Sequence, residues 1–282
     1  MPGFKSILVP VADADSAESP IATAFLIARS HGCRVTVLHV RVDIVAAMPL
    51  VGEGVSGAMV EEMVTLARRD ADARAEAVRA VFERLRAEAA PAMADQGFSV
   101  AWREESGREE EIVPLLGRVC DLIVMAGPRL NQDLPQVLTV NGALMESGRP
   151  VLVAPPARPV GVGRHVVVAW NHSIEAARAV GGTLPLLAAA ESVVVVAAQF
   201  DHLAEPEELL AYLALHGIHA EVKTMPTTGA RFGQILLAEA ATRGADLIVM
   251  GAYTHSRLRQ LIIGGVTRHV LEHSDLPVVL CH

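Results

Sequence analysis

The segment Asp246–His282 reads DLIVMGAYTHSRLRQLIIGGVTRHVLEHSDLPVVLCH and holds the clearest strand and helix pattern in the chain. Its apolar run, Leu247 to Met250, stops at Gly251, as a buried parallel strand does. Gly264-Gly265 precedes a helix-like stretch, and Pro277 introduces a last apolar strand. Glycines at a helix start expose backbone N–H groups to an anion, but a glycine pair is also a common tight loop. Both interpretations stay open on this pattern alone.

The pattern occurs twice. DLIVM stands at residues 121–125 and again at 246–250, and a Pro-Val strand closes each half, at 150–153 and 277–280. The first half is longer because it contains a glycine-containing loop and a charged, Ala-rich helix expected from Ala58 to about Ala94. The charge run on this helix indicates a solvated face.

Each half alternates strands and helices, which requires a parallel sheet with helices on both faces. We therefore predict an α/β protein of two tandem five-stranded parallel-sheet domains, at residues 1–156 and 160–282. The Pro-rich segment 154–159 is the expected linker. In such sheets, ligands bind beyond the carboxyl ends of the strands.

Composition narrows the function. The chain has 282 residues and a net charge of −8, which argues against a nucleic-acid partner. No stretch approaches the roughly 18 apolar residues of a membrane span, and no secretory signal is recognisable. The three cysteines have no metal-binding spacing and lie beside apolar strands, so we expect buried, inert thiols and a cytoplasmic protein.

Motifs for catalysis are missing. The sequence contains no Walker lysine, no GxSxG elbow and no HExxH pair, so we expect neither an enzyme nor a metal protein. His269 and His273 are four residues apart on a predicted helix, but no third ligand is close in sequence beyond Glu272. His255, Arg257 and Arg259 follow the strand at 247–250 and are equally compatible with phosphate contacts or a solvated loop.

Several of these features together resemble the universal stress protein family, as a tandem of two Rossmann-like domains of the adenine nucleotide alpha hydrolase type. They are the opening ILVPV strand with its acidic turn, the DLIVMG run, the glycine-rich helix start and the terminal PVVL strand. Nucleotide-binding members of the family carry G-x2-G-x9-G-[ST] after the fourth strand. Gly251, Thr254, Gly264 and Gly265 have this spacing, but Thr254 replaces a glycine and Gly265 replaces the Ser/Thr.

The resemblance implies an ATP or AMP site in the second half. The implied binding residues are Asn171 at the family's acidic position, Ala198 over the adenine, Gly251 and Thr254 near the phosphates, the amides of Gly264, Gly265 and Val266, and the Thr267 hydroxyl. The implied function is a cytoplasmic stress-response protein with a regulatory, non-catalytic role. The substitutions at Thr254 and Gly265 favour the alternative, an interaction or scaffold module in which both nucleotide sites are degenerate.

The first half departs further from the family pattern. Ala12 stands at the acidic position with Asp13 one residue later, Ala126-Gly127-Pro128-Arg129 follows the fourth strand, and Asn141-Gly142 is nearest to the glycine pair. We predict that this half has lost its nucleotide site. The family uses its fifth strand for dimer pairing, which implies that Val151–Ala154 pairs with Val278–Cys281 inside one chain as a pseudo-dimer. Association of two tandem chains is left open.

Overall fold

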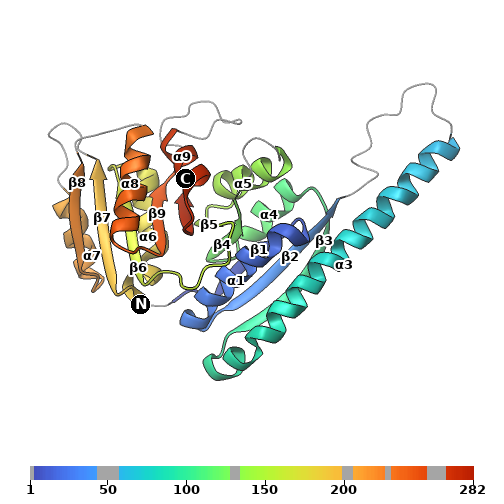
Figure 1. The fold of residues 1–282 in the computed structure, drawn as a ribbon, viewed down its shortest axis with the longest axis horizontal. Coiled ribbons are helices and arrows are strands. Elements are labelled where there is room, and N and C mark those ends of the chain that lie inside the picture. The colour runs from blue at the N-terminus through green and yellow to red at the C-terminus, as the bar shows by residue number, and fades with distance from the viewer. Residues whose placement is uncertain (1–2, 43–56, 128–133, 199–205, 226–229, 253–264) are drawn as a thin grey trace.

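The computed structural model describes residues 3–42, 57–127, 134–198, 206–225, 230–252 and 265–282. All its strands lie in one ten-stranded sheet with the order β3-β2-β1-β4-β5-β10-β9-β6-β7-β8 (Figure 1). Each half contributes five parallel strands in equivalent order. The predicted α/β class and the two tandem parallel sheets are therefore confirmed.

The inner strands are β-branched, apolar and buried, as expected of strands covered on both faces, whereas the outer strands β3 and β8 carry charged residues. The strands of the first half are β1 (Ser6–Pro10), β2 (Arg34–Val42), β3 (Ser99–Gly107), β4 (Leu122–Ala126) and β5 (Val151–Ala154). Those of the second half are β6 (His165–Trp170), β7 (Ser192–Ala198), β8 (Ala220–Met225), β9 (Leu247–Gly251) and β10 (Val278–Cys281).

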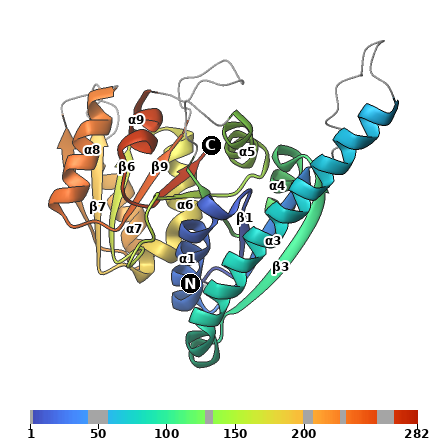
Figure 2. The same ribbon diagram turned by 45° about the vertical axis from the view of Figure 1, so that its right-hand side comes forward.

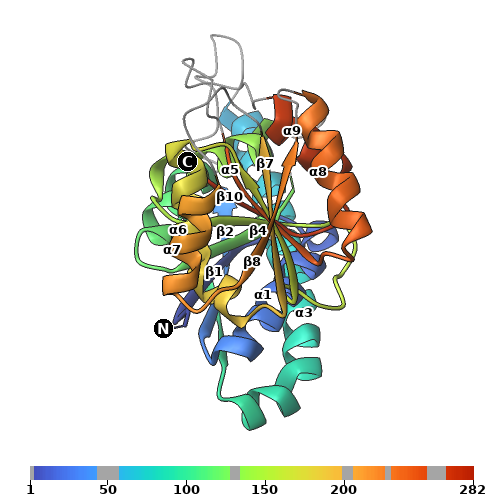
Figure 3. The ribbon, with the colours of Figure 1, turned by 90° about the vertical axis from the view of Figure 1, so that its left-hand side faces the viewer.

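Helices cover the sheet on both sides, as the view along it shows (Figure 3). One core layer lies under α1 (Ala14–His31), α3 (Gly57–Gln96), α6 (Ile174–Ala189) and α7 (Glu207–Leu215). The other lies under α4 (Glu109–Gly117), α5 (Leu134–Glu146), α8 (Ala230–Thr242) and α9 (Gly265–His273). Both layers run through both halves, so the two sheets share one continuous core.

The halves meet where β5 pairs antiparallel with β10. Val278 lies opposite Val153, and Leu280 lies opposite Val151. All four residues of each strand are buried. The predicted pairing inside one chain is confirmed, and it leaves β3 and β8 as the outer edges of the sheet.

Two helices begin earlier than their sequence indicates. The apolar periodicity of residues 19–31 predicts a helix from Ser19 after a turn and cap at residues 13–16. The helix begins at Ala14, because the carboxylate of Asp13 accepts a hydrogen bond from the Ser16 amide (2.8 Å) and caps it. Pro20 therefore lies inside α1, not at its start. The sequence also predicts a helix over residues 138–147, and this helix begins at Leu134.

The three cysteines are buried and unpaired, as predicted. Burial raises the pKa of the Cys33 and Cys120 thiols to about 11 and that of Cys281 to about 12. These thiols are therefore protonated and unreactive at neutral pH. No helix within the described residues combines the length and apolar character needed to cross a bilayer.

Candidate functional site

Three of the predicted binding residues lie at the carboxyl ends of the strands of the second half. Trp170 is level with Ala197 on one neighbour of β6, and Val168 is level with Val249 on the other. The next residues, Asn171 and Ala198, therefore stand beside Gly251 at the carboxyl ends of adjacent strands. α6 lies on one face of the sheet at these strand ends, and α9 lies on the other face. Ligands bind at the carboxyl ends of the strands in such sheets.

The turn from β6 into α6 is rigidly built. The side-chain oxygen of Asn171 accepts a hydrogen bond from the Ser173 amide (3.2 Å), and the Ser173 hydroxyl accepts one from the Ala176 amide (3.1 Å). The amide nitrogen of the Asn171 side chain makes no hydrogen bond within the described residues. Asn171 is therefore placed to donate to a ligand, while its oxygen is already used by the turn.

His172 lies between Asn171 and Ser173, and the sequence analysis did not single it out. It has a φ of 57°, the only positive φ of a non-glycine residue in the described chain. The indole N–H of Trp170 donates to its Nε2 atom (3.2 Å), and the two rings meet edge to face. Such backbone strain gathers at functional sites because the surroundings must enforce it. An Asn-His-Ser turn after a strand was the available signal.

Helix packing requires a glycine at position 251, which the sequence prediction did not include. A Cβ atom built there would lie 2.6 Å from the Ala176 amide nitrogen and 2.8 Å from the Glu175 carbonyl carbon. Its backbone is not in the left-handed region. The glycine is thus needed for the close approach of α6 to the end of β9, independently of any phosphate.

Gly265 begins α9 and is exposed. A Cβ atom there would meet nothing within 4 Å among the described residues. Val266 packs on the core layer beneath, and Thr267 is buried with 4% of its surface exposed. The expected role of the Thr267 hydroxyl as a donor to a ligand stays a prediction. Thr254 and Gly264 lie outside the described residues, as do His255, Arg257 and Arg259.

The histidines of α9 are occupied with each other. The rings of His269 and His273 stack with centroids 4.2 Å apart, and Nδ1 of His273 lies 2.9 Å from the His269 carbonyl oxygen. Within the described ranges, no group of three or more His, Cys, Asp or Glu side chains could hold a metal ion.

The equivalent place in the first half is nearly filled. Beyond the ends of β1 and β4 lies a cavity of only about 20 Å³, lined by Ala12, Ser16, Glu109 and Thr139 among others. Thr139 donates to the Glu109 carboxylate (3.4 Å). Burial, opposed by this hydrogen bond and assisted by the charges of Glu110 and Asp13, raises the pKa of the Glu109 carboxyl to about 7.

Gly142 also has a packing role. It lies inside α5, and a Cβ atom there would be 2.8 Å from the Glu110 carbonyl oxygen of α4. Asn141-Gly142 is therefore a helix–helix contact and not the start of a phosphate loop.

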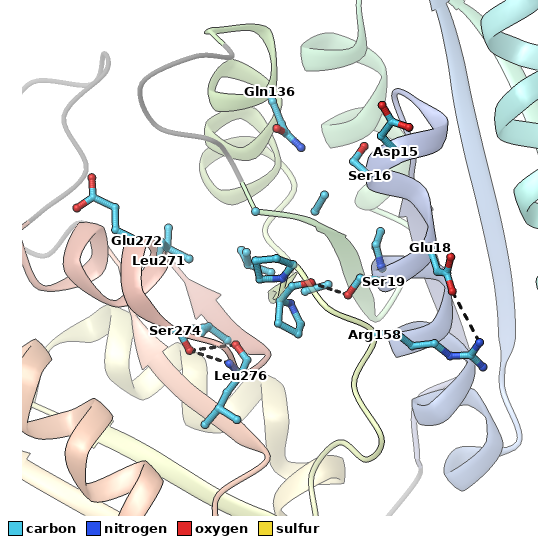
Figure 4. A pocket seen from close by; sticks show the side chains of 18 of the residues that line it. Asp15, Ser16, Glu18, Ser19, Gln136, Arg158, Leu271, Glu272, Ser274 and Leu276 are labelled. Carbon is cyan, nitrogen blue, oxygen red and sulfur yellow. Dashed lines mark hydrogen bonds and ion pairs between the residues drawn. The ribbon is translucent and has the colours of Figure 1, made fainter.

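A larger cavity of about 550 Å³ lies between the halves, beside α1, the end of β5 and the end of α9 (Figure 4). Its charged lining is mainly acidic: Asp13, Asp15, Glu18 and Glu272. Arg158 is its one described cation, and that guanidinium is bound to Glu88 (2.9 Å) and lies 3.9 Å from Glu18. Glu18 and Glu272 are paired with Arg84 and Arg268 (2.8 Å each), so among the described residues the unpaired negative charge of the lining lies at Asp13 and Asp15.

The comparisons with known proteins agree with this architecture. The sequence model described as the Universal stress protein family matches residues 163–282. Residues 163–282 belong to the universal stress protein family. No curated protein matches the chain in sequence.

Three solved structures share the tandem fold over nearly their full length. A universal stress protein from Archaeoglobus fulgidus DSM 4304 is 18% identical (TM-score 0.64) over 100% of this chain and 98% of that chain. A functionally unknown protein from Pseudomonas aeruginosa PAO1 is 16% identical (TM-score 0.55) over 99% and 92%. The cytoplasmic domain of a prokaryotic cation chloride cotransporter is 12% identical (TM-score 0.53) over 98% and 95%. These likenesses establish the fold.

Proposed function

We propose that the protein is a cytoplasmic stress-response protein that binds one adenine nucleotide, ATP or AMP, in its universal stress protein domain and acts by binding, without catalysis. The observation that carries this proposal is Gly265 at the start of α9, where a Cβ atom would meet no described residue, together with Asn171, Ala198 and Gly251 at the carboxyl ends of β6, β7 and β9. Bare amides at a helix start attract phosphate. Small residues at the strand ends leave room for a flat base.

The chemistry of the described residues fits such a ligand. The Asn171 side-chain amide can donate to a ribose hydroxyl or a ring nitrogen without bringing a charge near the phosphates. Glycine at 265 lacks the hydroxyl of the family pattern, but it keeps its backbone N–H. The predicted phosphate contacts at Thr254 and Gly264 belong to the same proposal.

The first test is a search for bound ligand. Nucleotide released from the purified, denatured protein would be identified by mass spectrometry, and the melting temperature would be measured with added ATP and AMP. A ligand at 100 times its dissociation constant adds about 2.7 kcal/mol of stability. Neither bound nucleotide nor a shift at saturating ATP would contradict the proposal.

Gly265 offers a sharper test because its side-chain position is empty. Gly265→Asp fits sterically and suits a helix start, but it places a negative charge where the phosphate would rest. We expect it to abolish nucleotide binding without loss of stability. Gly265→Ser, which restores the family hydroxyl, is the matched control and should bind at least as tightly as the parent.

The alternative is an interaction module without nucleotide. It is favoured by Gly251, because that glycine is explained by packing against α6 alone. It predicts that the parent does not bind ATP and that Thr254→Gly with Gly265→Ser creates binding. A parent that binds as tightly as this double variant contradicts the alternative.

A further inference from the structure

The first four turns of α3 extend beyond the sheet. Arg41, near the end of β2, forms an ion pair with Asp72 of α3 (2.5 Å). The fifteen residues from Gly57 to Ala71 precede Asp72 and span roughly 22 Å at 1.5 Å per residue. In Figures 1 and 2 this end of α3 stands clear of the other described elements.

This segment carries apolar side chains that the fold does not bury. Met59, Met63 and Leu66 are 55%, 57% and 60% exposed. Their spacing of four and three residues places them on one face of the helix. The stripe that packs on the body is a different one, with Ala75, Val78, Phe82 and Leu85 buried. The exposed face is therefore not needed to hold α3 in place.

The charged residues beside this face are complementary to the same residues of a second copy of the helix. Glu62 and Arg69 flank the apolar face on the same side, and both are exposed. Neither makes an ion pair within the described residues. If a second α3 packs antiparallel, with the two-fold axis near Thr65, Glu62 lies beside Arg69 of the second copy and the reverse pair forms by symmetry.

We propose that this face, defined by Met63, Leu66, Glu62 and Arg69, is a contact between two copies of the chain with their α3 helices antiparallel. Met63 of each copy then packs on Leu66 of the other. Asp70 interrupts the apolar stripe and limits the contact to a few turns, so the dimer is weak and dependent on concentration.

The rest of the fold supports a helical contact over a strand contact. The inner edges of the two half-sheets, β5 and β10, are already paired with each other. The outer edge strand β3 carries Arg103, Glu104 and Glu105, and charged side chains on an edge strand discourage pairing with another sheet.

The test is sedimentation velocity of the full chain over a wide range of concentrations. The parent should dimerise, and Leu66→Glu should raise the dissociation constant at least about tenfold, since it removes a buried apolar side chain from each half of the contact. Leu215→Glu is the control, because Leu215 is 86% exposed on α7, away from this face. At concentrations at which the parent is monomeric, all variants should keep the parent melting temperature.

A charge exchange tests the orientation. Glu62→Arg should weaken the dimer by repulsion from Arg69 of the second copy, and adding Arg69→Glu should restore it. A parent that is monomeric throughout, a dimer indifferent to Leu66→Glu, or a double variant as weak as the single one would each overturn the proposal. So would a monomeric parent that binds mixed neutral and anionic lipid vesicles through Leu66.

Discussion

At the scale of single residues, a glycine can be required by ligand contact or by packing, and the sequence alone does not distinguish the two. Gly251 was predicted from the family spacing as a phosphate-loop residue, and the structure shows it pressed against the first turn of α6. A motif shows that glycine is present, but it does not show which neighbour requires the missing Cβ atom. Only the packing of α6 on β9, a contact between residues about 75 positions apart in sequence, reveals it.

This packing predicts the effect of Gly251→Ala. The added methyl group meets backbone atoms that cannot move aside, so the free energy of unfolding should fall by about 1–3 kcal/mol. Gly181→Ala on α6 is the control, because its Cβ position is empty and alanine favours the helix. Urea denaturation of both variants measures this, and equal stability of Gly251→Ala and the parent would contradict the packing role.

Glu109 predicts a dependence on pH. Its folded pKa of about 7 lies above its ordinary value of 4.5, so the fold disfavours the charged form. Its destabilising effect is absent below about pH 4.5, grows as the pH rises, and is complete above about pH 7.

Glu109→Gln should therefore be more stable than the parent at about pH 8, by an amount of the order of 1–3 kcal/mol. The difference should vanish near pH 4.5. Glu111→Gln, an exposed carboxylate in the same helical turn, is the control and should change little. A stability difference for Glu109→Gln that is the same at both pH values would contradict the raised pKa.

At the scale of elements, strands were predicted better than helix ends. Apolar runs such as 247–250 report burial directly, so β9 and its relatives were found nearly to the residue. The cap at residues 13–16 was recognised, but the start of α1 was placed at Ser19, where the apolar periodicity begins, whereas Asp13 caps a helix that begins at Ala14. The strand-end residues of the site could be predicted by repeat alignment. The rigid turn at His172 and the filled site of the first half could not, because they depend on packing between distant segments.

Besides its apolar packing, α8 contacts the sheet through a buried carboxylate. Glu239 is 5% exposed and binds both Lys223 on β8 and Arg243 (2.9 Å). Lys223→Met keeps an apolar stem but removes one charge partner, so we expect a loss of about 1–3 kcal/mol in unfolding free energy. Arg268→Met breaks an exposed pair with Glu272 and should cost no more than about 0.5 kcal/mol. Equal effects in chemical denaturation would show that burial of Glu239 does not matter.

At the scale of the whole molecule, the β5–β10 pair and the shared core layers join the two halves into one body. We therefore expect a single cooperative unfolding transition in calorimetry, with equal calorimetric and van't Hoff enthalpies. Two separate transitions would show that the halves are energetically independent.

The duplication also gives one chain two equivalent sets of carboxyl strand ends, and their surroundings differ. The first is nearly filled beside Glu109 and adjoins an acidic cavity. The second keeps small residues at its strand ends, and a Cβ atom at Gly265 would meet no described residue. The central claim is that nucleotide binds only at the strand ends of the second half.

Isothermal titration of the full chain with ATP tests this claim most directly, because it measures the number of sites. We predict one site per chain in the parent, one in Gly265→Ser and none in Gly265→Asp. Two sites per chain, no binding by the parent, or binding that survives Gly265→Asp would contradict the account.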